Sequence, residues 1–121
     1  MNRWQLTDEI RKKFTPILKE YLDKIENMTE EEFDNVPDEA LAETFDLDLF
    51  GMGINPYQLW QLIEENFNYK EDSIDRNGWE QDFWISMRRT DGKTFPSGCE
   101  HLVISGCGMT FELSLGIYGV N

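Results

Sequence analysis

The 121-residue chain carries 24 acidic and 11 basic side chains, a net charge of −13, and 40% of its residues are hydrophobic. The hydrophobic content excludes a disordered acidic tail, and the charge disfavours direct binding to nucleic acid or to anionic membranes. No apolar run approaches the roughly 20 residues of a membrane span, and the first residues lack a signal-peptide core, so we expect a cytoplasmic protein. Cys99 and Cys107 are too few for a disulfide framework and are expected as free thiols.

The first predicted element is a long amphipathic helix. Apolar residues recur every three or four positions between Thr7 and Asn27, and Thr7 suits the N-cap. Pro16 removes a backbone donor and clashes with the preceding turn, so we expect either a kink or a restart of the helix with Thr15 as cap.

Three further helices are predicted before residue 69. Thr29 and Glu32 have the spacing of a capping box, which predicts a short helix from Thr29. Pro37 suits the first turn of another, and Asn55-Pro56 predicts the start of a helix that ends near Asn68.

From Trp79 onward the hydrophobic period changes to two, which predicts strands. Phe83, Ile85 and Met87 then share one face of a half-buried strand and Trp84 lies on the other. Asp91-Gly92 is a hairpin signal, and CEHLVISG and MTFELSLGIY predict two more strands joined by a tight GCG turn, with Phe111, Leu113, Leu115 and Ile117 on one face. We therefore predict one α+β domain over residues 1–121, with helices within about 5–68 packed against an antiparallel sheet of three to four strands within about 79–118.

The middle of the chain is acidic without compensation: residues 25–69 contain twelve acidic and no basic side chains. Some of these acids suit helix first turns, whereas Asp34, Glu43, Asp46 and Asp48 do not. If residues 30–48 were mostly helical, they would span at most about 28 Å and carry one negative charge per roughly 3 Å, close to the one per about 3.4 Å of a single DNA strand. The stretch is therefore either a docking surface for a basic protein or a solvated face.

Trp84 is the other candidate for partner binding, because a large aromatic side chain on the polar face of a strand is expected to be buried against another element or molecule. That cover is either one of the protein's own helices or a partner. The predicted partner-binding residues are Glu30, Glu31, Glu32, Asp34, Asp38, Glu39, Glu43, Asp46, Asp48 and Trp84.

No catalytic or metal-binding motif is complete. DLDLFG places Asp46, Asp48 and Gly51 like the start of an EF-hand loop, but the fifth and twelfth loop positions lack the oxygen ligands that calcium needs. Alternation of acids with leucines at the end of a helix is the simpler interpretation. Cys99, His101 and Cys107 are too few for a zinc site, and a Cys99–His101 dyad lacks an orienting third group. We expect no catalytic residues, no metal and no cofactor.

The pairing of NGWEQDFWISM with SGCGMTFELSLG, within residues 77–116, resembles small uncharacterised proteins of phages and mobile elements of Gram-positive bacteria. That group includes anti-CRISPR and other anti-defence inhibitors, many of them small, acidic and non-enzymatic. Members of this kind block the nucleic-acid channel of a host effector, so the resemblance implies a class of role, inhibition, and nothing about the target.

The leading hypothesis is a non-enzymatic inhibitor that binds a basic, nucleic-acid-handling protein through the acids of residues 30–48. Immunity proteins that neutralise a basic toxin are similar in size and charge and stay an alternative. A structural module that forms a homodimer through the Trp84 face is another, and a small enzyme using Cys99 and His101 is a third.

Overall fold

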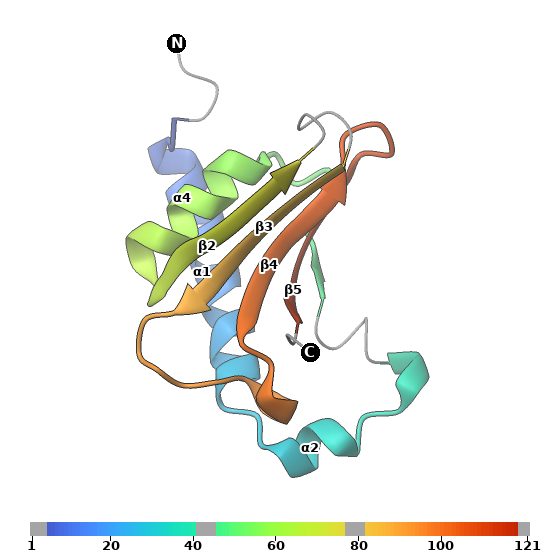
Figure 1. Ribbon diagram of the computed structural model, residues 1–121. Helices are drawn as coiled ribbons and strands as arrows, with labels where there is room; N and C mark the ends of the chain where they lie inside the picture. Colours follow the sequence, from blue (N-terminus) through green and yellow to red (C-terminus); the bar gives the residue numbers. More distant parts are fainter. Residues whose placement is uncertain (1–4, 41–45, 77–81, 119–121) are drawn as a thin grey trace.

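The computed structural model of the protein describes residues 5–40, 46–76 and 82–118, and it confirms the predicted α+β arrangement (Figure 1). In chain order the elements are α1 (Asp8–Glu26), α2 (Glu30–Asp34), the 3₁₀ helix η1 (Asp38–Ala40), β1 (Leu47–Asp48), α4 (Pro56–Asn66), β2 (Tyr69–Arg76), β3 (Asp82–Arg89), the 3₁₀ helix η2 (Pro96–Gly98), β4 (His101–Cys107) and β5 (Glu112–Tyr118).

The sheet has five antiparallel strands in the order β1-β5-β4-β3-β2, rather than the three to four predicted. The strands that the sequence did not indicate are the two at the edges. β2 has the sequence YKEDSIDR, in which charged residues replace a regular apolar alternation. Charged side chains are common on edge strands, where they oppose pairing with another chain.

Helix α1 forms as predicted, with the Thr7 side chain accepting a hydrogen bond from the Ile10 N–H. It is one helix from Asp8 to Glu26 that runs through Pro16, so the alternative of a restart at Thr15 is wrong. Its buried side chains are Phe14, Leu18, Tyr21, Leu22 and Ile25, which belong to the predicted apolar stripe.

The other helix starts also follow local capping. Thr29 and Glu32 form the predicted capping box of α2, and Asn55 and Gln58 form a second one at α4, with Pro56 at its first position. The helix predicted at Pro37 is present as the single 3₁₀ turn η1.

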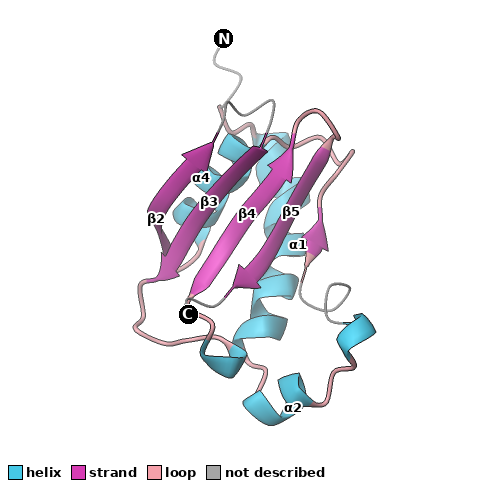
Figure 2. Ribbon diagram, turned by 45° about the vertical axis from the view of Figure 1, so that its right-hand side comes forward, coloured by secondary structure: helices cyan, strands magenta, loops and turns pink. Residues whose placement is uncertain are grey.

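Helices α1 and α4 lie on the same face of the sheet, which we call the inner face (Figure 2). The inner-face side chains of β3 are Phe83, Ile85 and Met87, with exposed fractions of 6%, 2% and 0%, as the period-two pattern predicted. The opposite side of the sheet, the outer face, has neither of these helices over it.

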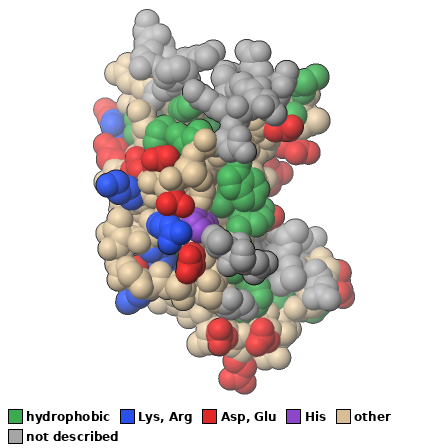
Figure 3. Space-filling model, in the orientation of Figure 1, with side chains coloured by type: hydrophobic (Ala, Val, Ile, Leu, Met, Phe, Trp, Pro, Cys, Tyr) green, Lys and Arg blue, Asp and Glu red, His purple; other side chains and the backbone are tan. Residues whose placement is uncertain are grey.

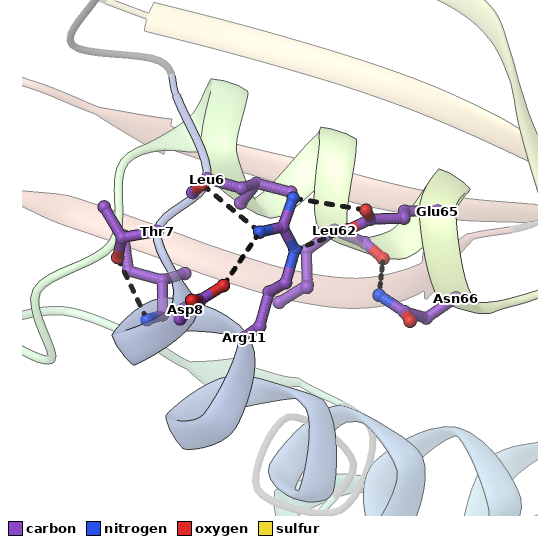
Figure 4. Close-up of polar contacts among 8 residues, drawn as sticks. Leu6, Thr7, Asp8, Arg11, Leu62, Glu65 and Asn66 are labelled. Carbon is purple, nitrogen blue, oxygen red and sulfur yellow. Dashed lines mark hydrogen bonds and ion pairs between the residues drawn. The ribbon is translucent and has the colours of Figure 1, made fainter.

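An ion pair ties α1 to α4 (Figure 4). The Arg11 guanidinium donates to both carboxylate oxygens of Glu65, with Nε–Oε2 and Nη2–Oε1 distances of 3.1 and 3.2 Å, and also contacts Asp8 and the Leu6 carbonyl at 3.4 Å. One of the twelve acids of the middle stretch is therefore neutralised by a residue 54 positions away.

Candidate partner-binding surfaces

Strand register arranges the outer face in rows that cross the sheet. Asp82, Cys107 and Glu112 form one row across β3, β4 and β5. Trp84, Ser105, Ser114 and Asp48 form the next row and extend it to β1. Since neighbouring strands lie about 4.8 Å apart, Trp84 and Asp48 are about 14 Å apart on one surface. The structure therefore brings together two predicted site residues that are 36 positions apart in the sequence (84 − 48).

Trp84 stays 39% exposed on this face. Its ring packs against Tyr118, with the two ring centroids 4.9 Å apart. Helices α1 and α4 pack on the opposite face, so the alternative that one of them covers Trp84 is excluded.

Beside Trp84 the outer face carries a polar cluster around His101 (Figure 3). His101 Nε2 lies 3.1 Å from Asp72 Oδ2, and Arg88 contacts Asp72 at 3.2 Å and Glu100 at 3.4 Å. The hydrogen bond with His101, supported by the charge of Arg88, lowers the pKa of the Asp72 carboxyl. The one guanidinium thus pairs with two carboxylates, and Asp72, Arg88 and His101 line a hollow of about 400 Å³.

The structure pairs His101, one member of the dyad in the enzyme hypothesis, with the carboxylate of Asp72. The Nε2 atom of His101 faces Asp72. Burial raises the pKa of the Cys99 thiol, which favours its unreactive protonated form. Among the described residues, no group of three or more His, Cys, Asp or Glu side chains is placed to hold a metal ion.

The DLDLFG segment has a different structure from the helix end that its alternation indicated. Leu47–Asp48 is strand β1, paired with Leu115 and Ser114 of β5. The Asp48 side chain accepts a hydrogen bond from the Phe50 N–H at 2.9 Å, which closes a tight turn. The helix interpretation of this segment is therefore wrong.

The acids of α2 and η1 gather at one end of the molecule (Figures 1 and 3). Glu30, Glu31, Asp34 and Glu39 are exposed, and none of them takes part in an ion pair with another described residue. Glu32 is exposed too, but its carboxylate caps the Thr29 N–H. Asp38 lies in η1, and Glu43 lies outside the described residues.

Asp46 and Asp48 belong to a separate surface, at the β1 edge of the sheet. Asp48 is exposed, whereas Asp46 is half-buried, and burial raises the pKa of its carboxyl. The Asp46 carboxylate fills the space beside Gly116, where an added Cβ would lie 2.2 Å from Asp46 Oδ1. The described part of residues 30–48 is thus divided among α2, η1 and β1, and the continuous helix that would repeat charge at the spacing of DNA is absent there.

Tertiary contacts occupy three other acids of the middle stretch. Glu65 pairs with Arg11, Glu26 accepts a hydrogen bond from the Tyr69 hydroxyl at 2.5 Å, and Glu64 accepts one from the Glu71 N–H at 2.8 Å. Of these three carboxylates, only Glu65 is neutralised by a cation, and the other two accept hydrogen bonds from neutral donors.

Sequence reasoning missed an apolar hollow at the end of the sheet where β4 turns into β5. It measures about 330 Å³, and its lining includes Leu49, Phe50, Ile54, Phe83, Phe111 and Leu113. Phe50 and Phe111 are 57% and 69% exposed, and Met109 in the same turn is 73% exposed. Phe111 was predicted to point inward from the last strand, but β5 begins at Glu112 and Phe111 is a turn residue with φ of 56°.

The exposed Phe50 ring had a signal in the sequence: it directly precedes the glycine-containing link GMG, where a turn is expected. The exposure of Phe111 had none, because its position continues the alternation of β5.

Comparisons with protein-family models, with curated protein sequences and with solved structures found no match. No helix of the described residues is long and apolar enough to cross a bilayer.

Proposed function

We propose that the protein is a non-enzymatic, acidic inhibitor that binds a basic, nucleic-acid-handling protein, of the anti-CRISPR or more general anti-defence type. It would act by occlusion: it occupies a basic surface that otherwise holds nucleic acid. No cofactor, metal or direct contact with nucleic acid enters this function.

The observation that carries the proposal is the group of exposed carboxylates at the α2 end, Glu30, Glu31, Asp34 and Glu39, without ion pairs among the described residues. Acids on a merely solvated surface gain stability by pairing with neighbouring Lys or Arg. An unpaired cluster keeps its full field, which accelerates association with a basic protein and excludes acidic competitors.

The outer face adds a second contact area of the same sign. Asp48, Asp82 and Glu112 are exposed there, and Trp84 supplies an aromatic side chain of the kind that anchors interfaces. Charges at the α2 end would direct the encounter, and aromatic side chains would slow dissociation.

The test is capture of proteins from lysates of candidate host cells on the immobilised protein, with elution in a salt gradient and identification by mass spectrometry. A double charge reversal, Glu31→Lys with Asp34→Lys, should lose the captured protein. The matched control is Glu9→Lys with Glu20→Lys on α1, which also changes the net charge from −13 to −9 (−13 + 4). Each pair contains one acid from the first turn of a helix, so the effects on helix stability are similar.

A nucleic-acid enzyme that binds the wild type and the control but not the reversed variant supports the proposal. Its nucleic-acid binding should then fall as the inhibitor is added. Equal capture by both variants, or capture that salt does not weaken, contradicts it. A basic toxin as the captured protein would instead make this an immunity protein.

A structural, self-associating module is the second candidate, because the exposed Trp84 ring packs against the half-buried Tyr118 on a sheet face without α1 or α4 over it. Sedimentation equilibrium decides this: a monomer at micromolar concentration removes the candidate.

A further inference from the structure

We propose that the apolar hollow between Phe50 and Phe111 is a socket for one large apolar side chain of the partner, flanked in the partner's sequence by Lys or Arg. This inference rests on the proposed function and specifies the chemistry of the segment that the protein recognises.

The hollow has the shape and composition of a side-chain pocket. The centroids of the Phe50 and Phe111 rings are 6.3 Å apart, and the rings form its rim. Its floor includes the core residues Leu49, Phe83 and Leu113, which are at most 6% exposed. Apolar clefts lined by aromatic side chains are the usual sites for apolar ligands, and 330 Å³ exceeds the volume of an indole or phenyl group.

The backbone holds Phe111 outward in an unfavourable conformation. Its φ of 56° lies in the left-handed region, where Gly or Asn is expected and a bulky residue is an outlier. Folding stability alone would select Gly or Asn at this turn position. An exposed Phe there agrees with a contact to another molecule.

The charges beside the rings decide which segment fits. Each Phe is accompanied by a carboxylate: Asp48 hydrogen bonds to the Phe50 N–H, and the exposed Glu112 follows Phe111 and lines the hollow. Among the described residues, no Lys or Arg lines it. The nearby N-terminus of α4 is closed by the Asn55–Gln58 capping box, so it offers little to an anion.

A basic segment is therefore favoured over a second copy of the chain. Two copies joined hollow to hollow would bring Asp48 and Glu112 against the same carboxylates of the other copy. Each copy also carries a net charge of −13. Like charges placed opposite each other in an interface oppose association.

The test uses the ¹⁵N-labelled full-length protein and three blocked peptides, Lys-Lys-Trp-Lys-Lys, Lys-Lys-Ser-Lys-Lys and Glu-Glu-Trp-Glu-Glu, titrated to millimolar concentration. The first peptide should shift the amide signals of residues 49–51 and 108–112. The serine peptide should leave those signals in place, and the acidic peptide should not bind. Phe50→Ser should weaken the Lys-Lys-Trp-Lys-Lys affinity at least fivefold, whereas Ile74→Ser, at another exposed apolar residue, should not change it.

Several outcomes overturn the inference. Shifts confined to α2 with both basic peptides would leave the acidic inhibitor proposal standing and remove the socket. Equal binding of the acidic and basic Trp peptides would show that the hollow is not selective for a basic segment. Concentration-dependent shifts at the hollow without peptide, lost in Phe50→Ser, would identify a second copy as the occupant. Absence of binding by all three peptides also removes the socket, and the capture experiment then decides the inhibitor proposal separately.

Discussion

The two faces of the sheet differ although the same strands build both. On β3, Ile85 and Met87 point to the inner face and are 2% and 0% exposed, whereas Trp84 points to the outer face and is 39% exposed. The inner face packs against α1 and α4, and the outer face carries Asp48, Asp82 and Glu112 in adjacent rows. On β3, alternation thus places Ile85 and Met87 in the core and leaves Trp84 accessible on the other face.

The largest expected effect comes from shortening an inner-face side chain. Ile85→Ala should lower the free energy of unfolding by about 3 kcal/mol, because it removes buried methyl groups and leaves a cavity. Trp84→Ser on the outer face should lower it by less than half as much, since part of the ring is already in water. Urea denaturation measures both, and equal losses would contradict the distinction between the faces.

A pair of glycines gives the next comparison. Gly106→Ala should lower the free energy of unfolding by about 2 kcal/mol, because the new Cβ would lie 2.1 Å from the Glu112 carbonyl oxygen and 2.8 Å from Phe83 Cζ. Gly116→Ala should lower the free energy of unfolding by clearly less. The atom nearest to the added Cβ there is Oδ1 of Asp46, at the end of a side chain that can rotate away. A larger loss at Gly116 than at Gly106, in the same urea experiment, would be the contrary result.

Asp46 sharpens the comparison through pH. Burial raises the pKa of its carboxyl in the folded protein above the value of about 3.9 expected in the unfolded chain. Ionisation is therefore less favourable in the folded state. Stability should fall as the pH rises from about 3.9 through the higher pKa that Asp46 has in the folded protein. Asp46→Asn should stabilise the protein by a few tenths of a kcal/mol at pH 7, with solvent screening included.

The gain from Asp46→Asn should shrink as the pH falls and disappear below about pH 4, where the Asp46 carboxyl becomes protonated in the folded and the unfolded protein alike. Thermal unfolding of the wild type and the variant at pH 3.5 and pH 7 checks the sign. A gain that is the same at both pH values would show that ionisation is not its cause.

The smallest effect on stability is expected at Phe111. Phe111→Asn relieves the left-handed backbone strain but loses the contact with Phe50, so the free energy of unfolding should change by less than about 0.5 kcal/mol. The same variant should weaken binding of Lys-Lys-Trp-Lys-Lys in the NMR titration. A marked loss of stability would mean that Phe111 serves the fold rather than a partner.

The candidate surfaces were only partly visible in the sequence. Glu30, Glu31 and Asp34 were predicted as exposed acids and are exposed. Their separation from Asp46 and Asp48 was not predicted, because the arrangement depends on β1 pairing with β5 about 70 positions away (115 − 47 = 68). The hollow of Phe50 and Phe111 was missed for the same reason, since it forms only when the β1–α4 link meets the β4–β5 turn.

The sequence by itself determined the features that depend on near neighbours: the helix starts at Thr7, Thr29 and Asn55, and the two faces of β3. Capping involves residues three positions apart, and strand alternation needs no partner to be recognised. Only the tertiary structure decided which acids are neutralised, as with Glu65 by Arg11, and which aromatic rings stay exposed. Those outcomes depend on contacts between distant segments, and no local pattern encodes such contacts.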